Sequence, residues 1–223
     1  MDSPFLTVLL PSLLVVPAMG LLSSIRSTGP VAAELKRKSL HVGIGFAALA
    51  FPFLLQSATA VLSALGLVTA WMLAVRRVPA LTARFGCVLT DAGRHSWGEF
   101  CYAAALGTLL LLPHRSYLSY AIPLLILTIS DSLAAVVGRS MPLGPLPGAL
   151  KDKSVSGSLA FLSSAFLIAT GPLLATTGPA DAGAWLAGAA IAVSTCLTEA
   201  ISRRGSDNLT IPLVAWAILA IVL

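Results

Sequence analysis

Long apolar runs constrain this chain more than any other feature of its sequence. The eight runs cover residues 4–25, 41–56, 58–75, 98–112, 117–137, 156–177, 183–201 and 209–223. About 20 apolar residues cross the roughly 30 Å hydrocarbon core of a bilayer, and in lipid every backbone polar group must be bonded within its own segment. The runs therefore predict an all-α, polytopic membrane helix bundle with about seven or eight transmembrane helices. We expect residues 1–223 to form a single integral membrane domain.

The composition agrees with lipid as the solvent. Of the 223 residues, 57% are hydrophobic and 10% are charged, whereas soluble proteins carry about 25% charged residues. This excludes soluble enzyme folds, immunoglobulin domains and disordered chains. The first apolar run lacks a basic leader and a small-residue cleavage site, so we expect it to remain as a span. The net charge of +5 belongs to loops that meet anionic headgroups and does not indicate nucleic acid.

The basic residues predict an orientation. If eight spans alternate, every Lys and Arg except Arg115 falls in loops on one side of the membrane. The positive-inside rule makes that side the cytoplasm. The compact, Ala- and Gly-rich chain without a targeting segment fits a prokaryotic inner membrane, with the functional site facing the cytoplasm.

Acidic residues gather on the same side, although the positive-inside rule does not require this. Glu99, Asp131 and Glu199 lie at or inside the cytoplasmic ends of apolar runs. Ionisable groups in membrane segments are costly and are functional candidates by default. The pattern predicts a polar site at the headgroup level. A small transporter is the alternative from another class, but transporter sites usually lie near the midplane on broken helices.

Two polar segments precede the second and fourth apolar runs. In the first, Glu34 can pair with Lys38 one helical turn later, and His41 lies at the membrane edge. A basic anchor beside a span explains this segment equally well. In the second, Trp97–Tyr102, the carboxylate of Glu99 can also be a residue stabilised by the helix dipole.

Three further segments lie in the second half of the chain. Asp131 has no basic residue within one helical turn, so it needs a metal, a distant Lys or Arg, or a proton as its partner. The loop 138–158 is rich in Gly and Pro and carries Lys153 before the sixth run, a pattern that suits phosphate or a plain linker. It is not a Walker A loop, because Asp152 precedes Lys153. Glu199–Pro212 brings carboxylates and an amide to one turn, as Mg²⁺ sites do.

Taken in this order, the five segments resemble the CTP-dependent lipid-alcohol kinases, which include dolichol kinase, phytol kinase and related polyprenol or diacylglycerol kinases. The matching stretches are Glu34–Gly45, Gly98–Tyr102, Asp131–Gly138, Lys153–Phe161 and Glu199–Pro212. The chain departs from the family where Met141 and Pro142 replace a second glycine after Gly138. The resemblance implies transfer of the γ-phosphoryl group of CTP to a membrane-dissolved lipid alcohol, with Mg²⁺ as the cofactor.

We assign roles to the residues of these segments as hypotheses. The predicted catalytic residues are Asp131, His41, Glu99 and Glu199. The predicted nucleotide and phosphate ligands are Lys36, Arg37, Gly138, Lys153, Ser154 and Gly157. The predicted Mg²⁺ ligands are Asp131, Glu199, Asp207 and Asn208.

A CTP-using phosphatidate cytidylyltransferase is the nearest alternative enzyme. It would share the membrane, the nucleotide and the metal, but it would release pyrophosphate. The Gly-His-Gly-Gly and paired-Asp signature of such enzymes is absent near the C-terminus, which favours the kinase.

Overall fold

The computed structural model describes residues 4–25, 30–89, 96–141, 143–147 and 153–223. Within these ranges every regular element is a helix, and a single isolated β-bridge joins Pro145 to Ser154. The predicted all-α membrane bundle is confirmed. The chain divides into two compact units, Met1–Leu112 (unit 1) and Pro113–Leu223 (unit 2), and each is described by itself; the single-domain prediction stays a prediction.

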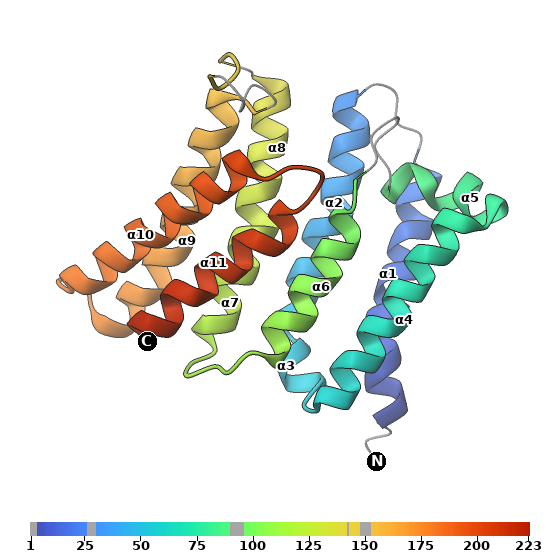
Figure 1. Cartoon of the computed structure of the whole chain (residues 1–223), viewed down its shortest axis with the longest axis horizontal. Helices are drawn as coiled ribbons and strands as arrows, with labels where there is room; N and C mark the ends of the chain where they lie inside the picture. Colours follow the sequence, from blue (N-terminus) through green and yellow to red (C-terminus); the bar gives the residue numbers. More distant parts are fainter. Residues whose placement is uncertain (1–3, 26–29, 90–95, 142, 148–152) are drawn as a thin grey trace. The chain divides into compact units, whose positions relative to one another are not determined.

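Unit 1 is built around a long apolar helix. Its helices are α1 (Pro4–Ser24), α2 (Pro30–Ala48), α3 (Phe51–Leu54), α4 (Ala58–Arg77), α5 (Pro79–Leu89) and α6 (Gly98–Leu111). Helix α4 packs against α1, α5 and α6 (Figure 1). As a result, the C-terminal end of α4 lies beside the N-terminal end of α6.

Unit 2 is a bundle in which neighbouring helices run in opposite directions. It contains α7 (Leu118–Leu125), a π-helical turn η1 (Ile126–Ser130), α8 (Asp131–Ser140), α9 (Val155–Thr177), α10 (Ala182–Ile201) and α11 (Asp207–Val222). Helix α9 packs between α8 and α10, and α10 also packs against α11 (Figure 1). This order brings the end of α8, the start of α9, the end of α10 and the start of α11 to the same end of the unit.

Four described helices are long and apolar enough to cross a membrane: Ala58–Arg77, Leu118–Ser140, Val155–Thr177 and Ala182–Ile201. Three shorter apolar helices accompany them, at Val8–Ser24, Gly98–Leu111 and Asp207–Val222. Large apolar side chains on these helices face outward, and Leu167, Leu186 and Ile221 are each at least 70% exposed. Lipid is the solvent that accepts such a surface.

Two sequence expectations about element boundaries were wrong. The expected span 41–56 is not one helix, because α2 begins at Pro30 and ends at Ala48, and the short α3 follows. The stretch between the third and fourth runs was expected to be a loop but contains α5. Its Pro79 suits the first position of a helix, and the ring of Phe85 packs on Trp71 of α4 with centroids 5.6 Å apart.

The core of unit 2 is a stripe of buried residues at helical spacing. On α9 these are Phe161, Ala165, Ala169 and Leu173, each four residues from the last. They meet Ala184, Ala187 and Ile191 of α10 and Ile211, Ala215 and Leu219 of α11. Small residues in the stripe allow the helices to approach closely, which is how membrane helices gain packing energy.

The closest approach between α8 and α9 is made by two glycines. A Cβ atom added to Gly157 would lie 2.8 Å from the backbone oxygen of Ala134, and one added to Gly138 would lie 2.6 Å from Ser154 Oγ. The helices could not keep this distance with a larger residue at either position. This contact fixes the start of α9 against the end of α8.

We expect Gly157→Ala to lower the thermal unfolding temperature in detergent, because the new methyl group meets backbone that cannot move cheaply. Gly171→Ala is the matched control on the same helix, since a Cβ there has nothing within 4 Å and alanine favours helix by about 0.5–1 kcal/mol over glycine. Equal unfolding temperatures for the two variants would contradict the contact.

Candidate active site

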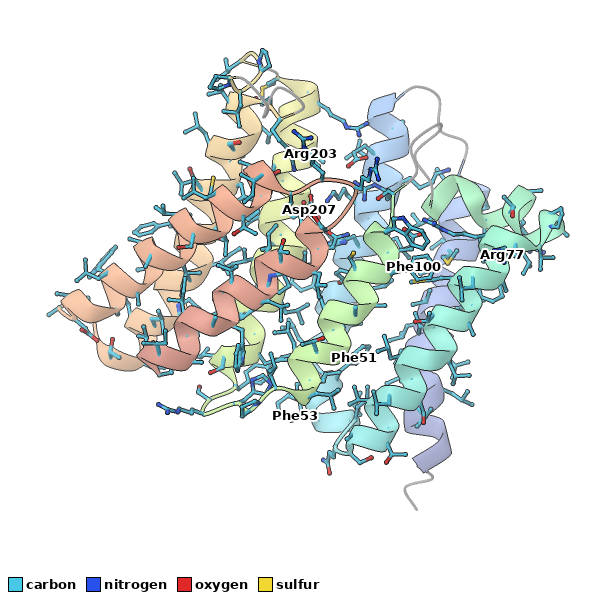
Figure 2. All side chains as sticks on the ribbon, viewed as in Figure 1. Phe51, Phe53, Arg77, Phe100, Arg203 and Asp207 are labelled. Carbon is cyan, nitrogen blue, oxygen red and sulfur yellow. The ribbon has the colours of Figure 1, made fainter. Side chains whose placement is uncertain are left out.

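The polar site of unit 2 is centred on Lys153. Its ammonium group forms an ion pair with Glu199 and lies 3.5 Å from Asp207 Oδ2. The side chain of Glu199 is 6% exposed. Figure 2 labels Asp207 at the start of α11 and Arg203 in the turn that joins α10 to α11. Residues that lie far apart in the sequence therefore meet at one end of this helix bundle.

The backbone on both sides of Lys153 holds it in place. The Leu146 N–H donates to the Lys153 carbonyl (2.9 Å), and the Val155 N–H donates to the Gly144 carbonyl (3.0 Å). Ser154 is the N-cap of α9, and its Oγ accepts from the Gly157 N–H at 3.1 Å. The N-cap serine and the hydrogen-bonded loop therefore fix the position of the Lys153 backbone, and with it the origin of the side chain.

The charge of Asp131 acts on the same lysine. Burial by itself lowers the pKa of Lys153, but the charges of Glu199 and Asp207 outweigh burial, and the charge of Asp131 adds to them. The pKa of Lys153 is therefore raised above its ordinary value. The sequence predicted that Asp131 needs a partner from elsewhere, and Lys153, from another segment of unit 2, is one positive charge that acts on it.

The helix is irregular where it reaches Asp131. The π-helical turn Ile126–Ser130 ends directly before this residue, and π-turns inside α-helices occur frequently at functional sites. The hydroxyl groups of Thr128, Ser130 and Ser132 are buried there, and the described residues provide no hydrogen-bond partner for them. The sequence analysis missed this turn; the run of hydroxyl residues around an intramembrane aspartate was its signal.

Three predicted phosphate ligands also have packing roles. Gly138 and Gly157 form the close contact between α8 and α9, and Ser154 caps α9. The N–H groups of Val155 and Gly157 already donate within the protein. Of the residues predicted to bind phosphate in this region, Lys153 has the side chain that carries a positive charge.

The donor set of unit 2 fits a magnesium ion shared with a substrate. No three His, Cys, Asp or Glu side chains in the described ranges are close enough to hold a metal by themselves. Mg²⁺ usually takes one or two carboxylates and completes its shell with phosphates and water. Glu199 Oε2 is buried and has no hydrogen-bond partner in the part of the chain that the structure describes. Asp207 and the buried Asn208 begin the adjacent helix. Glu199 and Asp207 supply the two carboxylates that such a site needs.

Unit 1 holds the other predicted residues, and several have local partners. Glu34, almost fully buried, forms an ion pair with Arg37 at 2.6 Å. Lys36 donates to the carbonyl of Ile25, just beyond α1, also at 2.6 Å. The first contact lies within the start of α2, and the second connects α2 to the residue that follows α1.

His41 is buried against α6. Its ring lies 4.3 Å from the ring of Tyr102, and the Tyr102 hydroxyl donates to the His41 carbonyl at 3.2 Å. The tyrosine thus fixes both the ring and the backbone of this histidine. Tyr102 belonged to a segment that the sequence singled out, but its contact with His41 could not be inferred from spacing.

Glu99 is paired with an arginine that the sequence analysis did not select. Arg76, in the last turn of α4, forms an ion pair with Glu99 and also donates to the Ser96 carbonyl. Its guanidinium lies 5.3 Å from the Trp97 ring centroid and 5.0 Å from that of Phe100. Arginine between aromatic rings is a favourable cation–π arrangement. Arg76 therefore fixes the start of α6, where Glu99 lies.

Comparison with known proteins identifies the class. No family model matches the chain, and no solved structure matches it. The chain is 33% identical over 197 residues to the protein named phytol kinase from Synechocystis sp., covering 83% of this chain and 79% of that relative. A helical membrane protein with this relative is a membrane-embedded kinase of the lipid-alcohol class. The chain belongs to the phytol kinase-like family of polyprenol kinases.

We expect Lys153→Met to destabilise unit 2, because it leaves Glu199 and Asp207 without their cation. Loss of one partner of a largely buried pair costs about 1–3 kcal/mol, measured as a lower unfolding temperature in detergent. Adding Glu199→Gln should recover part of the loss. Arg115→Met, at an exposed loop position, is the control. Additive effects of the two substitutions would contradict the pairing.

The stabilisation by Lys153 should not vary with pH in the neutral range. Because the folded pKa is raised, the contribution is complete below the unfolded value of about 10.4 and is lost only as pH rises through the folded pKa. Lys153 also helps to keep the Glu199 carboxylate charged, so the comparison is made between Glu199→Gln chains with and without Lys153→Met. Their difference in unfolding temperature should stay constant from about pH 6 to 9. A difference that disappears within this window would contradict the assignment.

Proposed function

We propose that this protein transfers the γ-phosphoryl group of CTP to the primary hydroxyl of an isoprenoid alcohol dissolved in the membrane, with phytol as the first candidate. The new bond joins the alcohol oxygen to the γ-phosphorus, and the bond between that phosphorus and the β-phosphate oxygen breaks. The hydroxyl proton passes to a base of the protein, and the products are the lipid monophosphate and CDP. Family membership and the ion-pair cluster of unit 2 support this proposal.

The observation that carries the proposal is the Lys153–Glu199–Asp207 contact. Phosphoryl transfer depends on positioning and on neutralising phosphate charge. The two carboxylates keep the lysine protonated at the end of the bundle. A phosphate group that binds there would find a positively charged partner already in position. Lys153 is assigned to the CTP phosphates, with Ser154 and the glycines Gly138 and Gly157 shaping the loop around it.

The remaining roles follow from the donor atoms. Asp131, Glu199, Asp207 and Asn208 would hold Mg²⁺, which neutralises charge on the transferring phosphates when it is bound. A carboxylate, Asp131 or Glu199, is assigned to orient the alcohol and take its proton. For unit 1 we keep the roles assigned from the sequence, with His41 and Glu99 as catalytic residues and Lys36 and Arg37 as phosphate ligands.

The proposed site faces the cytoplasm of a prokaryotic cell. CTP and Mg²⁺ are water-soluble, whereas the hydroxyl of a lipid alcohol lies at the headgroup level. The predicted basic loops between the spans of unit 2 are on the side of Lys153, and the positive-inside rule supports the cytoplasmic orientation.

The decisive assay uses purified protein, CTP labelled in the γ-phosphate and a panel of alcohols: phytol, geranylgeraniol, undecaprenol, dolichol and diacylglycerol. We expect label in a lipid monophosphate with CTP and much less with ATP. Release of pyrophosphate with formation of a CDP-lipid would instead indicate a cytidylyltransferase.

Asp131→Asn should lower kcat by about a hundredfold or more, since general acid–base and charge-stabilising groups contribute at least this much. Asp181→Asn is the matched control: Asp181 caps the opposite end of α10 through the Gly183 N–H, and asparagine is an equally good cap. A folded Asp131→Asn variant with the rate of the control would defeat the role of Asp131.

A further inference from the structure

A hollow between α9 and α10 lies on the same two helices that carry the polar site. It has a volume of about 310 Å³ and is lined by Leu162, Ser163 and Phe166 of α9 and by Ala189, Ala192 and Val193 of α10. The Ser163 hydroxyl donates back to the Leu159 carbonyl of its own helix, so the hollow offers carbon surface. Ligand pockets begin at about 300 Å³.

A continuous seam connects this hollow to Lys153. On α10, Ala192, Cys196 and Glu199 are spaced i, i+4 and i+7 and therefore share one helix face. Cys196 Sγ donates to the Ser158 carbonyl of α9 at 3.6 Å. Ser158 lies one turn before Leu162, which lines the hollow, and five residues after Lys153. The seam therefore passes from apolar side chains to the ion pair along one helix–helix contact.

Two buried oxygen atoms on this seam have no hydrogen-bond partner among the described residues. They are Ser158 Oγ and Glu199 Oε2. A buried polar atom without a partner is costly, and in a membrane bundle the cost is not relieved by bulk water. A hydroxyl group has the chemistry that suits both atoms, because it can accept from a serine hydroxyl and donate to a carboxylate.

We propose that the hydroxyl of the acceptor binds between Ser158 Oγ and Glu199 Oε2, with its hydrocarbon tail in the hollow between α9 and α10. This inference rests on the proposed function and names the subsite that recognises the acceptor. Six residues separate Val193 from Glu199, so the hollow begins about 9 Å along the helix from the carboxylate. The hydroxyl end of the alcohol then contacts polar atoms and the hydrocarbon end contacts apolar side chains, all on helices α9 and α10.

An aromatic pair lies at the end of the hollow away from Glu199. Phe166 lines the hollow, and its ring lies 6.1 Å from that of Trp185, which is one turn before Ala189 on α10. The Trp185 N–H donates to the Pro179 carbonyl at 3.1 Å, which fixes the indole.

The test fills the hollow and compares a long acceptor with a short one. Ala189 lies ten residues before Glu199, about 15 Å along the helix, so phytol reaches it and geraniol does not. Ala189→Phe should lower kcat/KM for phytol by about tenfold or more, the size of effect that pocket shape produces, and leave geraniol within about twofold. Ala190→Phe is the matched control, because Ala190 is the exposed neighbour on the same helix.

Val193→Phe narrows the near end of the hollow at a half-exposed lining position and should lower kcat/KM for phytol as well. Unfolding temperatures of all variants identify any that fail to fold. A native phytol-to-geraniol ratio in folded Ala189→Phe, or a native kcat/KM for phytol in folded Val193→Phe, would overturn the inference.

Binding of labelled phytol without nucleotide separates failure of this inference from failure of the proposed function. The native chain should bind phytol, Ala190→Phe should match it, and Ala189→Phe and Ser158→Ala should bind several-fold more weakly. Binding with this pattern but no phosphorylation would overturn the kinase and keep the subsite. Phosphorylation with unchanged phytol binding in Ala189→Phe and Ser158→Ala would overturn the subsite and keep the kinase.

Discussion

Two carboxylates at the end of a membrane bundle stay charged together only if a cation lies between them, because lipid and protein screen charge poorly. In unit 2 that cation is Lys153, between Glu199 and Asp207. The ion pairs join the start of α9 to the end of α10 and the start of α11. The glycine contact of α8 with α9 then brings the helix that begins at Asp131 to the same place.

The same interaction links stability to function. The cation that keeps Glu199 and Asp207 charged is also the group proposed to bind phosphate. Under the proposed function, Lys153 would bind the phosphates of the nucleotide, and Glu199 and Asp207 would be the carboxylates that hold Mg²⁺. The same three side chains would then serve both stability and function.

Much of the fold could be predicted from sequence, because lipid leaves helices as the available structure for long apolar runs. Hydropathy marks where a chain enters lipid, however, and not where a helix begins. The polar first half of α2, from Pro30, was therefore left outside the predicted span 41–56. Helix α5 was missed for the opposite reason: it is short, and tertiary packing of Phe85 on Trp71 stabilises it rather than a long apolar run.

The candidate site was predictable as a set of residues but not as a set of contacts. An intramembrane aspartate required a partner, yet no spacing rule connects Lys153 to Glu199, which lies 46 residues away, or Arg76 to Glu99. Such pairs depend on how the helices pack against each other. That packing in turn depends on small residues such as Gly157, whose role is not visible in the sequence.

An enzyme that transfers a phosphoryl group from a soluble nucleotide to a lipid must offer both a polar and an apolar environment within one site. Helices α9 and α10 do so along their length: Lys153 and Glu199 carry charge at one end, and the apolar hollow ends at Phe166 and Trp185. Ser158 and Cys196 lie between the two and are joined by a hydrogen bond. A lipid alcohol likewise has a polar group at one end and hydrocarbon at the other, and this match is the physical basis of the proposed acceptor subsite.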